Sequence, residues 1–181
     1  MELWLETTLK GLYDSALDAF PSTTRRQNST HSVVVEHMDW VPFRGVNTLF
    51  VKSLVRNAGR KNEAIVLFKG VRFADAAQRD FVPIKASDGK EVYLERVSWD
   101  KTETLVRCSC ADFRWRFSHW NGVDRSLFGR PPKRYEAQER PGSSNPEELP
   151  GMCKHLMKMA KILAESGVLK LKPSQIGGLG H

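Results

Sequence analysis

The stretch VRCSCADF, residues 106–113, places Cys108 and Cys110 one residue apart in a chain that has three cysteines in all. A disulfide between this pair would close a strained ring, and three cysteines leave one unpaired in any scheme. Residues 104–110, TLVRCSC, have the composition of a strand. Because side chains at i and i+2 of a strand share a face, both thiols can point at one ion where the strand ends.

The third cysteine lies in GMCKHL, residues 151–156, where Cys153 and His155 are again one residue apart. The residues after this pair carry apolar side chains at helical spacing as far as Gly167, so the pair stands at a helix start. Three thiols and one imidazole complete the tetrahedral ligand set of a structural zinc ion. The ion would join the two ends of residues 111–152, a segment of 42 residues that we call the excursion. The four predicted zinc ligands are Cys108, Cys110, Cys153 and His155.

The composition predicts a soluble chain with one main domain. At 181 residues and 40% hydrophobic content, the chain is long enough to bury a substantial core. No run approaches the roughly 18 apolar residues of a membrane span, and the start, MELWLETTLK, lacks the features of a signal peptide. We therefore expect a reducing compartment, no membrane contact, and thiols that stay available for metal.

An apolar stripe near the N-terminus predicts the first helix. Apolar side chains recur at helical spacing over residues 8–19, and Pro21 ends the pattern. The polar residues 22–30 indicate a linker. The helix can dock on the chain's own sheet or on another subunit, and the apolar residues around Trp4 keep the second alternative open.

Between residues 32 and 110 the chain consists of short runs rich in Val, Leu and Phe that predict strands. The Asp88-Gly89 pair is a strong hairpin signal, and further turns are expected at 57–61 and at 100–101. Because the connections are too short for crossover helices, we predict an α+β fold with a mainly antiparallel meander, folded as a sandwich or an open barrel. The predicted strand runs are 32–38, 46–55, 63–73, 81–86, 91–99 and 104–110.

These patterns divide the chain into four parts. The first two are an N-terminal helix with its linker, and an antiparallel β domain. They are followed by a zinc-clipped segment, which holds a Pro-rich arm and a helix, and by a C-terminal tail. In chain order the parts are residues 1–31, 32–107, 108–167 and 168–181.

The start of the excursion, DFRWRFSHW at residues 112–120, interleaves aromatic side chains with arginines. The aromatic residues fit a helix at i, i+4 and i+7, and they also fit a strand in which they alternate with arginines. We predict a short helix, because Asp112 can cap it and the following NGVDRS ends it. The aromatic rings could stack on bases, or they could pack on the sheet while the arginine stems reach solvent.

The second half of the excursion, residues 130–151, reads RPPKRYEAQERPGSSNPEELPG and is rich in Pro, Gly, Ser and charge. We predict an extended arm without regular structure, anchored at both ends by the zinc and suited to lying on a neighbouring molecule. The net charge of +7 permits association with nucleic acid or with an acidic protein surface. Candidate nucleic-acid or partner contacts are Arg114, Arg116, Arg130, Lys133, Arg134, Lys154, Lys158 and Lys161.

The CxC pair followed at a distance by CxH resembles the SWIM-type zinc motif. The resemblance covers the last third of the chain and implies metal-ligand roles for the four residues named above. SWIM modules are associated with both nucleic-acid and protein interaction. The spacer between the two pairs is longer here than is usual for that motif.

The chain also resembles a group of tailed-bacteriophage proteins with three successive elements: CxC-x-x-F, a Pro-rich stretch, and Asn-Pro followed by Gly-x-Cys-Lys-His-Leu. In this sequence the elements read CSCADFRWRF, GRPPKRY and NPEELPGMCKHL. The resemblance extends into the preceding strands, including VLFKGVRF. It implies a virion protein that is assembled in the host cytoplasm.

The leading hypothesis is a zinc-stabilised, non-enzymatic structural or adaptor protein of a phage particle, in contact with other virion proteins and with copies of itself. Four protein ligands close a zinc tetrahedron, whereas catalytic zinc keeps a position for water or substrate. The sequence contains no phosphate-binding Gly-rich loop, so neither catalysis nor a small-molecule substrate is expected. The alternative hypothesis is a SWIM-like nucleic-acid-binding accessory protein that uses the cationic residues above.

Overall fold

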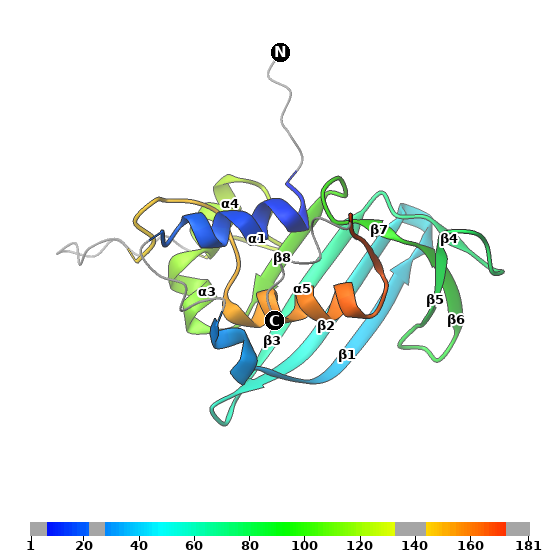
Figure 1. Ribbon diagram of the computed structural model, residues 1–181, viewed down its shortest axis with the longest axis horizontal. Helices are drawn as coiled ribbons and strands as arrows, with labels where there is room; N and C mark the ends of the chain where they lie inside the picture. The colour runs from blue at the N-terminus through cyan, green and yellow to red at the C-terminus, as the bar shows by residue number, and fades with distance from the viewer. Residues whose placement is uncertain (1–6, 22–27, 133–143, 173–181) are drawn as a thin grey trace, which may run out of the picture.

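The computed structural model describes residues 7–21, 28–132 and 144–172. Figure 1 shows an α+β fold in which helix α5 crosses one face of a four-stranded antiparallel sheet and helix α1 lies near the β8 side of it. None of the helices in these three ranges is long and apolar enough to span a membrane. In chain order the elements are α1 (Leu9–Asp18), η1 (Ser29–Ser32), β1 (Val34–Phe43), η2 (Arg44–Val46), β2 (Thr48–Asn57), β3 (Arg60–Lys69), β4 (Phe73–Ala74), β5 (Phe81–Lys85), β6 (Glu91–Glu95), β7 (Val97–Ser98), β8 (Thr104–Cys108), α3 (Ala111–Arg116), α4 (Ser118–Val123), α5 (Lys154–Glu165) and β9 (Leu169–Lys170).

The main sheet has the strand order β1-β2-β3-β8, and all its pairs are antiparallel. The β2–β3 hairpin turns at Ala58 and Gly59, whose φ angles of 48° and 77° are those of a two-residue type I′ turn. Strand β8 then pairs with β3, with Cys108 opposite Ala64, although four strands separate them in sequence. The predicted α+β class is therefore confirmed, while the order of the strands departs from a simple meander at β8.

The strands between β3 and β8 form structure of their own at one end of the main sheet. Strands β4, β6 and β5 make a three-stranded antiparallel sheet in that order. Strand β7 pairs in parallel with β9, with Val97 opposite Leu169. Part of the segment predicted as a tail is thus a strand, and residues 173–181 lie outside the described residues.

The core lies between the main sheet and α5. Alternate residues of β2 are buried on the helix side, as the period of two in a strand requires. The apolar stripe predicted for the C-terminal helix is also fully buried, and Gly167 follows the helix with a φ of 77°. The packed residues are Leu49, Val51, Ser53 and Val55 of β2 and Leu156, Met159, Ala160 and Leu163 of α5.

Helix α1 packs on the chain's own core. Thr8 caps it, since its Oγ1 accepts a hydrogen bond of 3.1 Å from the Gly11 N–H. Leu12 and Ala16 are fully buried, and the Lys10 N–H donates to the Trp99 carbonyl at 3.0 Å. The structure thus favours docking on the chain's own fold. The residues around Trp4 lie outside the described part of the chain.

The excursion after β8 begins with two short helices, α3 and α4. The prediction of helix is confirmed, but the cap is Cys110 and Asp112 lies in the first turn, where it pairs with Arg116. Phe113 and Phe117 are 1% and 0% exposed, so these rings belong to the core. The reason for the earlier cap is that the Cys110 sulfur can accept the Phe113 N–H as soon as the strand ends.

The Pro-rich arm has described residues at both of its ends. Residues 130–132 and 144–151 form neither helix nor strand, which agrees with the predicted lack of regular structure there. The middle of the arm, 133–143, is not among the described residues.

Gly151, at the end of the arm, is packed too closely for a side chain. A Cβ at this position would lie 2.8 Å from Phe117 Cε1 and 3.0 Å from Ala16 Cα. The backbone of Gly151 also makes two hydrogen bonds with the buried Asn121 amide, at 2.8 and 3.1 Å. Because Gly151 has no side chain, α1, the excursion and the start of α5 can pack against one another at this position.

Replacement of this glycine should destabilise the fold. Gly151→Ala forces the Phe117 ring and α1 apart, and we expect a loss of about 1–3 kcal/mol in the free energy of unfolding, measured by denaturant titration. Gly45→Ala is the matched control, because a Cβ there meets nothing within 4 Å. It should change the free energy of unfolding by no more than about 0.5 kcal/mol. Equal stability of the two variants would contradict the packing argument.

Candidate metal centre

The fold brings all four predicted ligands into one buried cluster. Cys108 is the last residue of β8, and Cys110 caps α3 through its sulfur. Cys153 directly precedes α5, and His155 lies in the first turn of that helix. The four residues are 4%, 6%, 0% and 4% exposed, respectively. The structure therefore has the first ligand pair at the end of a strand and the second pair at the start of a helix, as predicted.

Ser109 explains why the first pair shares a face. Its N–H donates to the Glu63 carbonyl, and its Oγ accepts the Glu63 N–H, both at 2.9 Å. The residue after β8 thus stays beside β3, so Cys108 and Cys110 remain on the same side of an extended segment. The Phe113 N–H then donates to the Cys110 sulfur at 3.3 Å, which fixes the second thiol at the start of α3.

The second pair is positioned by the packing of Gly151 and by α5. The Met157 N–H donates to the Cys153 carbonyl at 3.0 Å, which makes Cys153 the boundary of the helix. Its thiol stands at the N-terminus of a helix of 12 residues, where the helix dipole favours a thiolate. His155 turns inward from the same end, so both side chains reach the sulfur atoms of the first pair.

The distances fit a tetrahedral ion. His155 Nδ1 lies 3.7 Å from the Cys108 sulfur and 3.9 Å from the Cys153 sulfur. All four ligand atoms lie within 4.8 Å of one another. A zinc ion with Zn–S of about 2.3 Å and Zn–N of about 2.0 Å separates its ligand atoms by about 3.5–3.8 Å. The cluster therefore needs only small adjustments to hold a metal ion.

The three buried thiols of the cluster favour the binding of a cation. Hydrogen bonds from the Cys108 and Cys153 thiols lower the pKa of Cys110, so this residue is the first to become a thiolate. The hydrogen bond with Cys110 raises the pKa of Cys108, and burial raises that of Cys153. Three buried thiolates would repel one another at close range, and a bound cation removes that repulsion.

The orientation of His155 selects its ligand atom and its tautomer. Nδ1 faces the sulfur atoms, so coordination through Nδ1 requires the proton to be on Nε2. Nε2 is buried and has no hydrogen-bond partner in the described part of the chain. The imidazole is therefore held by packing and by the cluster itself.

The candidate cations of the excursion that the structure describes are exposed. Arg114 is exposed, with its guanidinium 5.0 Å from the centre of the Trp115 ring, and Arg116 pairs with Asp112. Arg130 is exposed near the described start of the arm. The other two candidates on the arm, Lys133 and Arg134, lie outside the described residues.

Two of the three lysines of α5 donate hydrogen bonds within the chain. Lys154 Nζ donates to Asn57 Oδ1 at 2.8 Å. Lys161 is buried, donates to Thr30 Oγ1 at 3.1 Å, and has a pKa lowered by burial. Lys158 is half-buried. The six described candidates thus lie on α3, at the start of the arm and on α5, and three of them, Arg116, Lys154 and Lys161, already have a partner within the chain.

Two asparagines that support the centre have no obvious sequence signal. Asn121 holds the Gly151 backbone as described above. Asn145 is 1% exposed and its amide donates to the carbonyls of Arg116 and Leu149, which ties the returning arm to α3. Asn145 precedes a proline, and an Asn-Pro pair indicates a turn, but no pattern shows that its side chain is buried.

Loss of one ligand should release the metal and destabilise the fold, because binding free energy at such a site is also folding free energy. We expect Cys110→Ser, Cys153→Ser and His155→Gln each to lower the bound metal well below one ion per chain and to reduce the melting temperature. Metal content is measured by plasma mass spectrometry and melting by circular dichroism. His37→Gln is the control, because His37 is exposed and lies outside the cluster. Unchanged metal content in all three ligand variants would disprove the centre.

Comparison with known proteins finds no matching family model, no similar curated protein and no similar solved structure. The resemblances to the SWIM motif and to tailed-phage proteins thus have no support from a relative. The buried cluster of three cysteines and one histidine stands on the geometry of the chain itself.

Proposed function

We propose that this chain is a zinc-stabilised, non-enzymatic structural or adaptor protein. The observation that carries the proposal is the buried cluster of Cys108, Cys110, Cys153 and His155. Four protein ligands satisfy a tetrahedral ion, so no position remains for water or substrate, and a structural role follows. Zinc is the proposed metal, because three thiolates and an imidazole are a common zinc ligand set.

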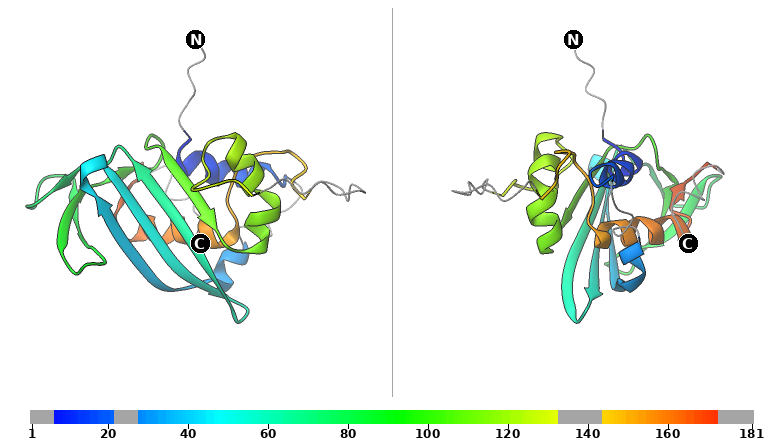
Figure 2. Two further views of the ribbon diagram at one scale, coloured as in Figure 1. Left: turned by 180° about the vertical axis from the view of Figure 1, so that it is seen from behind. Right: turned by 60° about the vertical axis from the view of Figure 1, so that its left-hand side comes forward.

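The outer face of the main sheet supports a role in protein contact. One row of half-buried apolar side chains crosses the four strands at paired positions. The row consists of Val41, Phe50, Leu67 and Leu105. In the left view of Figure 2, β1, β2 and β3 have no helix over this face. Burial of this row against another subunit would remove apolar area from water, which favours association with other proteins or with copies of the chain.

The assignment to a virion rests on the motif resemblance. The elements CSCADFRWRF, GRPPKRY and NPEELPGMCKHL include all four metal ligands. We propose that the chain is a subunit of the neck, tail or capsid-associated assembly of a tailed phage, and that it assembles in the host cytoplasm. Its partners would be other virion proteins.

A closed coordination sphere can be tested with cobalt. We expect the Co²⁺-substituted protein to show the visible absorption of a tetrahedral thiolate site and to remain unchanged when azide is added, because the protein supplies every ligand. The His155→Gln variant, where it retains Co²⁺, should respond to azide, because the substitution opens a position. A shift of the unsubstituted protein's spectrum on addition of azide would contradict the structural role and favour a catalytic metal.

The virion assignment can be tested on particles of the phage that encodes the chain. Quantitative mass spectrometry of purified particles should find the chain at a fixed ratio to the portal and capsid proteins. An abundant host protein that is lost during the same purification serves as the control. Absence of the chain from particles would reject the virion role.

A further inference from the structure

A groove of about 540 Å³ lies beyond the C-terminal end of α5, away from the metal centre at its N-terminal end. Its walls come from the segment before β4, from β6 and β7, from the turn after β7, and from β9. The parallel pairing of β7 with β9 brings Ser98 opposite Lys170 and so joins the last described residues to the middle of the chain. The groove therefore exists only in the folded chain.

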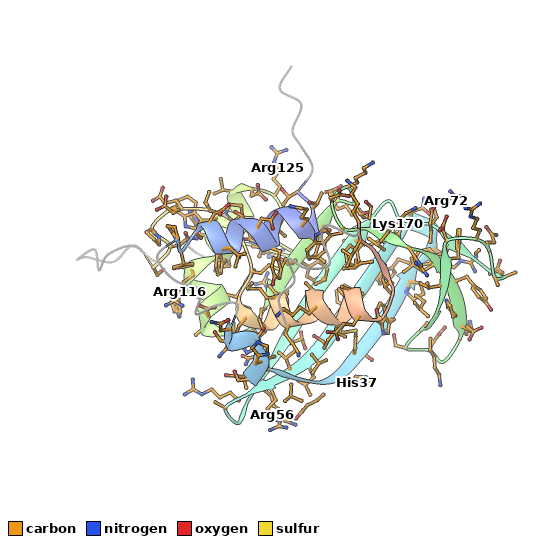
Figure 3. All side chains as sticks on the ribbon, in the orientation of Figure 1. His37, Arg56, Arg72, Arg116, Arg125 and Lys170 are labelled. Atoms are coloured by element: carbon orange, nitrogen blue, oxygen red, sulfur yellow. The ribbon has the colours of Figure 1, made fainter. Side chains whose placement is uncertain are left out.

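The lining of this groove is strongly cationic. It contains five cationic side chains and two carboxylates. Figure 3 shows Arg72 and Lys170 at this end of the molecule, where β4 and β7 lie. The charged lining residues are Arg72, Arg96, Lys101, Lys170 and Lys172, with Glu95 and Asp100.

Both carboxylates already have a cation beside them. Glu95 Oε2 lies 3.5 Å from Arg72 Nη1, and Asp100 Oδ2 lies 2.8 Å from Lys172 Nζ. The remaining three cations, Arg96, Lys101 and Lys170, are exposed and have no carboxylate partner among residues 7–21, 28–132 and 144–172. They contribute three positive charges to one concave surface.

Three like charges around a groove repel one another and attract a counter-anion. A concave wall of low dielectric strengthens that attraction relative to an open surface. The Arg96 guanidinium adds a planar fork that matches two oxygens of a phosphate, and the two lysines add point charges. We propose that this groove binds the phosphate backbone of a nucleic acid.

The apolar part of the lining favours nucleic acid over an acidic peptide. Peptides bind through apolar anchors in pockets together with backbone hydrogen bonds. Val71 and Val97 line the groove but are only 5% and 3% exposed, and Leu171 is half-buried. The groove thus offers charges and few apolar anchors, which suits contacts to phosphates without sequence readout.

The test measures the binding of the metal-loaded full chain to a fluorescein-labelled DNA of random sequence, as single strand and as duplex, by fluorescence anisotropy over a range of salt concentrations. We expect the triple variant Arg96→Gln, Lys101→Gln, Lys170→Gln to bind at least tenfold more weakly at low salt. For the duplex, the slope of log affinity against log salt should become shallower by about 2–3, because each phosphate contact contributes about 0.9.

A matched triple variant removes the same charge elsewhere. Arg60, Arg79 and Lys85 are also exposed and lack an ion pair in the described ranges. Arg60→Gln, Arg79→Gln, Lys85→Gln should retain the affinity and the salt slope of the unsubstituted chain. Melting temperature and metal content, measured for both triple variants, exclude loss of fold as the cause.

Three results would overturn the proposal. The first is an unsubstituted chain that does not bind either DNA at low salt, and the second is an equal loss of affinity in both triple variants. The third is displacement of the DNA by a poly-glutamate peptide at a lower charge concentration than by unlabelled DNA, which would assign the groove to an acidic protein partner. The proposal is independent of the virion role, since particle composition does not enter this experiment.

Discussion

The burial of four potential metal ligands from two distant places in the chain in one cluster is the constraint on which the rest of this structure depends. Without a cation, burial raises the pKa of the Cys153 thiol, and the cluster favours a single thiolate at Cys110. With a cation, the end of β8 and the start of α5 become one unit. A cross-link that closes a loop of this length removes about 4 kcal/mol of entropy from the unfolded chain.

Apolar packing also fixes the junction between the two ligand pairs. Gly151 lies against Phe117 and Ala16, and Asn121 holds its backbone from the other side. Phe113 and Phe117 fill the space between α3 and the core and are almost fully buried. The excursion is therefore part of the hydrophobic core at its beginning and its end. This packing thus joins α1, the excursion and α5 at a single place.

Local patterns predicted the parts of this fold whose signal lies within a few residues. The period of the apolar residues predicted both long helices, and the i, i+2 spacing of the ligands placed the centre at a strand end and a helix start. The pairing of β8 with β3 could not be derived, because it depends on packing between residues far apart in sequence. The same limit applies to β9, where Leu169 and Lys170 carry too little pattern to predict a strand. The cap at Cys110 was missed because cysteine is not among the usual capping residues.

Helix α5 connects the metal centre with the proposed phosphate groove. Its 12 residues span about 18 Å, with Cys153 and His155 at the first end and β9 shortly after the other. Lys170 reaches the groove only because β9 pairs with β7, and β9 follows α5 by a short turn at Gly167. The position of α5 is in turn fixed by the ligand cluster at its N-terminus and by the burial of its apolar stripe against the main sheet. A change in the candidate metal centre should therefore reach the groove through α5, without any contact between the two sites.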